Sequence, residues 1–195
     1  MKKIDIICDL ETLGTKTTSP IIQIAAIACD IASRTILDRF NVFIDVSKDS
    51  SEIDVGTIKW WLDTNPDLLT DILSKGNKKE KIAIKEFTEW LEKVRFTYAQ
   101  REKDKKCELL FWGNGILFDN CLIRAACERN GFEYPIKFWN DRDLRTLLML
   151  ASLKSGVSEK TIKDRAVDKN LEAHDAMNDC ENELKIAYAC YEILM

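Results

Sequence analysis

The fold can be read outward from Ile4-Asp-Ile-Ile-Cys-Asp9-Leu-Glu11-Thr12. Residues 4–9 are mostly apolar and predict a first strand. Side chains two positions apart on a strand point to the same face, so Asp9 and Glu11 are expected side by side where the strand ends. Two such carboxylates repel each other, and a hard divalent cation such as Mg²⁺ between them relieves the repulsion. For an isolated Asp-x-Glu pair, a solvated strand end is the more common explanation.

Around this stretch, the pattern predicts a mixed α/β sheet with helices on its faces. Residues 21–29 and 36–45 read as two further strands, which together with the first predict an antiparallel meander. The later elements are helices near 58–62, from Pro66 and from about Glu80, a strand over 107–112, a helix over 118–130, an extended piece at 136–139, and helices over roughly 141–153 and from Ala176. The charged stretch 101–106 is expected to be solvated and 154–172 to be irregular.

Composition narrows the class of protein. The chain has 195 residues and a net charge of −4, which fits one domain, 1–195, and argues against a broad basic face for nucleic acid. The sequence contains no apolar run of membrane-spanning length and no signal-peptide pattern, so we expect no membrane partner and a cytoplasmic location. The seven cysteines are scattered without a CxxC pair, which favours reduced, buried thiols.

Three more residues carry chemistry, although each has an ordinary structural explanation. Asp119 follows a strand and a Gly-Asn-Gly turn at a helix start, where aspartate is often only a cap. His174 is the only histidine in the chain, and Asp179 lies five residues later on the last helix. A lone histidine is more often a packing residue, and a helical aspartate is usually exposed. Taken singly, none of the three indicates a site.

Their order along the chain is more informative. Asp9-Leu-Glu11-Thr12, Phe118-Asp119-Asn120 and His174-Asp-Ala-Met-Asn-Asp179 together resemble the DEDDh exonuclease superfamily. A narrower resemblance, to the T-even phage exonuclease A group and a mycobacterial 3′–5′ exoribonuclease-like domain, rests on the following further blocks: Asp9–Thr15, Ser19–Ile24, Thr57–Trp61, Trp112–Gly115 and Phe138–Thr146. The resemblance extends from about residue 4 to residue 190.

This resemblance implies a ribonuclease H-like exonuclease domain that hydrolyses the 3′ end of single-stranded DNA or RNA. It implies two Mg²⁺ ions, with Mn²⁺ able to substitute. Asp9 would bridge both ions, Glu11 and Asp179 would complete one site, and Asp119 would support the other. His174 would be the general base that accepts a proton from the attacking water, since an imidazole exchanges protons near neutral pH. Related enzymes are often dimers, which makes a homodimer one possibility.

The resemblance also suggests residues that contact the substrate. The turn Thr12-Leu13-Gly14 is expected to meet the terminal nucleotide, with Leu13 wedged beside the last base. Trp60 and Trp61 are adjacent and cannot share one helical face. One of them, with Trp61 as the choice, is expected to stack on a base, and packing of both is an equal alternative.

Further candidates are polar. Asn114 and Asn120 are expected to hold carboxylates or the sugar edge, or else to be turn and cap residues. Arg142 and Arg145 would lie one helical turn apart and reach phosphate, with Arg145 the stronger candidate, unless they pair with neighbouring aspartates.

Two other functions stay open on the sequence alone. A nucleic-acid-binding module with the same fold and little or no catalysis is the main alternative, although such modules usually lose at least one of the five catalytic residues. A ribonuclease H-like endonuclease is another. Preference for DNA or RNA cannot be read from these residues.

Overall fold

In the computed structural model, residues 2–47, 52–101 and 107–195 are described, and within them five strands form one sheet in the order β3-β2-β1-β4-β5. The strands are β1 (Lys2–Thr12), β2 (Ile21–Asp30), β3 (Thr35–Phe43), β4 (Cys107–Gly113) and β5 (Asp141–Asp143). β1, β2 and β3 pair antiparallel, whereas β4 runs parallel to both β1 and β5. The predicted meander and mixed sheet are therefore confirmed.

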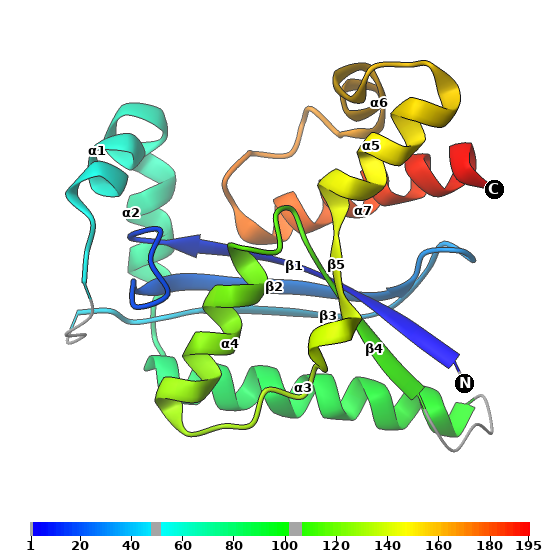
Figure 1. Ribbon diagram of the computed structural model, residues 1–195. Helices are drawn as coiled ribbons and strands as arrows, with labels where there is room; N and C mark the ends of the chain where they lie inside the picture. The colour runs from blue at the N-terminus through cyan, green and yellow to red at the C-terminus, as the bar shows by residue number, and fades with distance from the viewer. Residues whose placement is uncertain (1, 48–51, 102–106) are drawn as a thin grey trace.

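Helices cover both faces of this sheet (Figure 1). Their bounds are α1 (Val55–Thr64), α2 (Pro66–Lys75), α3 (Glu80–Arg101), α4 (Asp119–Asn130), α5 (Leu144–Ser155), α6 (Glu159–Ala166) and α7 (Ala176–Leu194). α3 and α4 lie on one face, α5, α6 and α7 on the other, and α1 and α2 pack beyond the end of β1. The helix predicted from Pro66 is capped by Asn65, and the helix predicted to end at 130 is followed by Gly131 with a left-handed φ of 77°.

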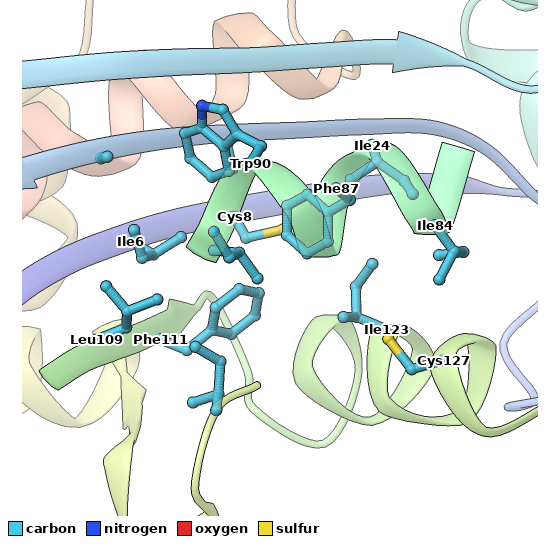
Figure 2. Close-up of a cluster of buried hydrophobic side chains, with 14 of the residues drawn as sticks. Ile6, Cys8, Ile24, Ile84, Phe87, Trp90, Leu109, Phe111, Ile123 and Cys127 are labelled. Atoms are coloured by element: carbon cyan, nitrogen blue, oxygen red, sulfur yellow. The ribbon is translucent and has the colours of Figure 1, made fainter. Parts of the chain in front are cut away.

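The alternation of β1 assigns its side chains to two cores. Ile6 and Cys8 face α3 and α4, where Figure 2 shows Phe87 of α3 and Phe111 of β4 packed around them. Ile7 faces α5 and α7 instead. Residues two apart share a face, so the β1 carboxylates that follow Ile7 also point toward α7. The functional end of β1 is therefore directed at the C-terminal helix.

Two predictions along the chain are wrong. The segment 154–172 was expected to be irregular, but it contains α6, whose first turn is capped by the Ser158 hydroxyl accepting from the Thr161 N–H. The polar sequence hides this helix because only Ile162 is buried. The piece expected to be extended at 136–139 instead leads into a 3-10 helix, Phe138–Asn140, and the strand follows at Asp141–Asp143.

Other expectations have simpler outcomes. The helix expected from about 141 begins at Leu144, because Asp143 caps it by accepting from the Thr146 N–H. Residues 102–106 of the charged stretch lie outside the described residues. The structure assigns none of the seven cysteines to a disulfide bond. Six are buried, as predicted, and Cys121 is only partly buried. None of the described helices is long and apolar enough to cross a membrane.

Candidate active site

Four carboxylates from three elements meet beyond the ends of β1 and β4. Asp9 and Glu11 come from the end of β1, Asp119 is the first residue of α4, and Asp179 lies in the first turn of α7. β1 and β4 are parallel, with Ile7 opposite Trp112, so their carboxyl ends lie next to each other. Glu11 and Asp119 are only 7% and 3% exposed. The fold thus gathers acids that are far apart in sequence.

His174 completes one side of this cluster. One ligand atom each of Glu11, His174 and Asp179 lies within 4.8 Å of the others. The His174 backbone N–H donates to Asp179 Oδ2 at 2.9 Å, and its φ of 69° is left-handed. Such a backbone conformation is uncommon outside glycine and tends to occur at functional sites. The imidazole is therefore held against two of the carboxylates.

Gln23 of β2 fixes the chain segment that carries His174. It is fully buried opposite Glu11, and its Oε1 accepts from the Ala176 N–H at 3.2 Å. Its Nε2 donates to Asp175, the residue that caps α7. The start of α7 is thereby pinned to the sheet, which places the preceding histidine. Gln23 belongs to the Ser19–Ile24 block, but nothing in that block indicates this role.

Burial and mutual repulsion make the cluster electrostatically unfavourable without cations. Desolvation, followed by the charges of Asp179 and Asp175, raises the pKa of Glu11 to about 9. Desolvation raises the pKa of Asp9 well above its usual range, and the neighbouring carboxylates add to it. Hard divalent cations prefer oxygen ligands, and they would remove both costs. The donor set therefore fits the metal ions that the sequence predicts.

Asp119 is the most firmly held of the acids. Desolvation raises its pKa to about 7, although backbone N–H groups of Asp119 itself, Leu10 and Asn114 donate to its carboxylate and act in the opposite direction. Arg145 lies close enough to lower it further, and Arg145 Nε also donates to Asn114 Oδ1 at 3.3 Å. A hollow of about 690 Å³ opens here, lined by Asp9, Asn114 and Arg145 among others.

The Thr12–Gly14 turn follows the two β1 carboxylates, and its apolar side chain, Leu13, is buried. Leu13 is 3% exposed and packs with Ile22 and Trp61 in a third core, so the expected wedge beside the last base is wrong for Leu13. The Thr12 hydroxyl donates to the Gly14 carbonyl at 2.8 Å. A Cβ at Gly14 would lie 2.3 Å from Ser19 Oγ, so the close packing of this turn requires glycine.

One of the two adjacent tryptophans is buried and the other is exposed, as predicted, but the exposed one is Trp60 and not Trp61. Trp61 is 1% exposed, and its Nε1 donates to the Thr12 carbonyl, so its ring is not available to stack on a base. Trp60 is 43% exposed and meets the His174 ring edge-on with the centroids 4.9 Å apart. It lines a hollow of about 360 Å³ that also contains Glu11 and Phe118. The stacking candidate is therefore Trp60.

Two polar candidates do not face the pocket. Asn120 is 2% exposed, and its amide donates to the Phe111 carbonyl and to Asp141, which makes it a structural link. Arg142 belongs to β5 and not to a helix, and it donates to the carbonyls of Trp139 and Asp141. The predicted helical pair of Arg142 and Arg145 is therefore wrong. Asn114 and Arg145 remain at the pocket.

Two charged residues beside the cluster, Glu183 and Lys163, were not predicted from the sequence. Glu183 lies one helical turn beyond Asp179 and is 4% exposed. Its spacing along the buried stripe of α7 was the available signal. Lys163 comes from the unpredicted α6. Desolvation, the largest effect, raises the pKa of Asp179, and the charge of Lys163 acts in the opposite direction. No local pattern in 154–172 indicated this contribution.

Comparison with known protein families shows which family this chain belongs to. The family model described as "3'-5' exoribonuclease Rv2179c-like domain" matches residues 4–191. The chain belongs to this family. The domain is accordingly a 3′–5′ exonuclease, and its five matching residues follow the DEDDh pattern. It is also 25% identical over 201 residues to the exodeoxyribonuclease of Enterobacteria phage T4, covering 92% of this chain and 86% of the phage protein.

Solved structures agree on the fold. The domain resembles the nuclease domain of 3'hExo, a DEDDh family member bound to rAMP, with a TM-score of 0.58 and 14% identity over 95% of this chain and 90% of that one. It also resembles E. coli ExoI in a complex with ssDNA, with a TM-score of 0.59 and 18% identity over 96% of this chain. The domain spans only 40% of the ExoI chain. The predicted ribonuclease H-like α/β class is confirmed.

Proposed function

We propose that this domain removes mononucleotides from the 3′ end of single-stranded nucleic acid with the help of two divalent ions, Mg²⁺ or Mn²⁺. The observation that carries the proposal is the approach of Glu11, His174 and Asp179, whose ligand atoms lie within 4.8 Å of one another. Asp9 and Asp119 adjoin them, as their mutual charge effects indicate. A packing histidine would have no reason to stand against two acids in a strained backbone conformation.

The four acids would hold the ions and the histidine would move the proton. Asp9, Glu11, Asp119 and Asp179 supply the oxygen ligands. When bound, divalent ions stabilise the charge on the attacking and leaving oxygens. His174 accepts the proton of the attacking water, since its ring lies at the open edge of the cluster beside Glu11. Water adds to phosphorus, and the bond between phosphorus and the 3′ oxygen of the preceding nucleotide breaks. That oxygen takes up a proton, and the terminal nucleotide leaves as a nucleoside monophosphate.

The hollow around Trp60 suits the terminal nucleotide. Trp60 and Phe118 line it together with Glu11, so a base resting there would place its phosphate at the carboxylates. Stacking on an aromatic ring stabilises a base by about 1–3 kcal/mol and tolerates any sequence. Phe118 also lines the larger hollow beside Asp119, so the two hollows lie on either side of one side chain. The preceding nucleotide would occupy that second space.

A basic hollow continues from there onto α6. It measures about 300 Å³ and is lined by Arg145, Lys160 and Lys163, and it shares Asn114 and Arg145 with the space beside Asp119. Cations at this spacing would contact the phosphates that precede the scissile one. The protein is acidic overall, so this local group of cations would contact one strand without a broad basic face.

The test uses matched DNA and RNA oligonucleotides labelled at the 3′ end. We expect labelled mononucleotides in Mg²⁺ or Mn²⁺, none in EDTA, and none when the 3′ end is blocked. No release with either metal would favour a binding module without catalysis, and cleavage of the blocked strand would indicate an endonuclease. The parallel rates decide between DNA, which the phage relative's name suggests, and RNA, which the family's name suggests. A homodimer and a cytoplasmic location stay predictions.

A further inference from the structure

Glu183 brings a fifth carboxylate to the site. It stands four residues after Asp179 on α7, so both side chains lie on the same side of the helix. It falls within the buried stripe of that helix, between Cys180 and Leu184, where a leucine or alanine would normally pack. Cys180 contacts the Ile7 carbonyl, which places this part of α7 directly over β1.

The carboxylate of Glu183 is only half satisfied. The Asn114 side-chain amide bonds to it, whereas Oε2 has no hydrogen-bond partner among the described residues. Asp5 offers a comparison, because it is also buried on the same face of β1 yet accepts from Trp112 Nε1 and from the Ile31 N–H. A buried carboxylate without partners is costly to the fold. Asp5 can be explained as a structural group, but Glu183 cannot.

The neighbours of Glu183 are the proposed metal ligands. Among the charged neighbours, Glu183 has the largest effect on the pKa of Asp9, ahead of Asp119 and Glu11. Asp119 in turn has the largest effect of any charge on the pKa of Glu183. The unsatisfied oxygen therefore lies among acids that it repels. A structural role would place a donor at this oxygen, but no described residue provides one, because Asn114 bonds to the other oxygen.

We propose that Glu183 is a fifth metal-binding carboxylate of this site and offers Oε2 to the ion on the Asp9 and Asp119 side. Asn114, itself fixed by Arg145, holds the other oxygen and orients the group. The inference rests on the proposed function in one respect, since both require divalent ions at this cluster. It extends that function by adding a ligand that the five-residue pattern does not contain.

The experiment compares Glu183→Gln and Glu183→Leu with the wild type by titrating Mn²⁺ alone in a calorimeter, without substrate. Glu192→Gln is the matched control, because Glu192 lies on the same helix but is exposed and paired with Arg34. We expect both Glu183 variants to bind Mn²⁺ about 10- to 100-fold more weakly, the usual effect of changing an orienting or coordinating group. The control should bind as the wild type does.

Melting in EDTA supplies the second measurement. Removing an unsatisfied buried charge should leave the metal-free variants at least as stable as the wild type. Unchanged Mn²⁺ affinity would overturn the proposal, and so would a loss of folding in both variants, because Glu183 would then serve the structure. An active wild type whose affinity is insensitive to Glu183 refutes only this inference. If the Glu183 variants bind Mn²⁺ more weakly but the wild type releases no nucleotides, only the proposed exonuclease reaction is refuted.

Discussion

Raising the pH of the metal-free protein should destabilise it, which is unusual for an acidic protein near neutrality. In the folded state the pKa of Asp119 is raised to about 7, whereas in the unfolded chain it returns to its ordinary value of 3.8. Below pH 4 the carboxyl is protonated in both states and costs nothing. Above pH 4 the unfolded chain releases this proton, whereas the buried carboxyl retains it up to about pH 7. Stability therefore falls as the pH rises through this range, and the contribution of Asp119 levels off above about pH 8.

The size of the effect follows from the same values. A shift from 3.8 to about 7 corresponds to roughly 4 kcal/mol, at about 1.4 kcal/mol for each pH unit. For a domain of this length, about 2–4 °C is lost per kcal/mol, so the melting temperature should fall by roughly 8–16 °C. Most of this fall lies between pH 5 and 8. Glu11, whose pKa is raised to about 9, extends the fall to higher pH.

The assay is thermal unfolding followed by circular dichroism at pH 5, 6, 7 and 8, in EDTA and in excess Mn²⁺. Mn²⁺ should remove most of the fall, because bound cations stabilise the ionised acids. Asp119→Asn should flatten the curve in EDTA, since it deletes the charge but keeps an oxygen that can accept the backbone N–H bonds. A metal-free melting temperature that is constant or rises from pH 5 to 8 would refute the reasoning.

Three further predictions concern catalysis and substrate. His174→Ala should lower kcat by about 10²–10⁴-fold and leave Mn²⁺ affinity largely unchanged, and unaltered hydrolysis at saturating metal would end the general-base assignment. Trp60→Ala should raise KM for a single strand by about 5- to 150-fold, the equivalent of 1–3 kcal/mol of stacking, with kcat preserved; an unchanged KM would remove Trp60 from the substrate path. Replacing both Lys160 and Lys163 by alanine should reduce the slope of log KM against log salt by about 1.4. Lys85→Ala, a control on α3 beside Glu89, should leave the slope unchanged. Equal slopes in the double variant and the wild type would contradict a phosphate path over α6.

Much of the fold was readable because its signals are local. The alternation in β1, the Asn65-Pro66 helix start and the stop at Gly131 each depend on a few adjacent residues, and the structure has all of them. α6 was missed because its sequence carries no comparable local signal. It buries little more than Ile162, so its sequence lacks an apolar stripe, and a serine cap with tertiary packing holds it instead.

The candidate site was predicted less evenly. The five candidate catalytic residues were identified through their order along the chain, and the structure places them close together. The substrate residues were assigned to the wrong side chains where exposure decides the role. Leu13 and Trp61 are buried and Trp60 is not, and no local pattern separates two adjacent tryptophans into core and surface.

The sequence alone determined most of the strands and helices, the family and a candidate set of acids, because periodicity and motif order are properties of the chain itself. Only the tertiary structure decided which side chains share a space. The crossing of α7 over β1 brings Glu183 to Asp9 across more than 170 residues, and α6 brings Lys163 beside Asp179. Such contacts depend on how helices pack on a sheet, which residue spacing does not encode.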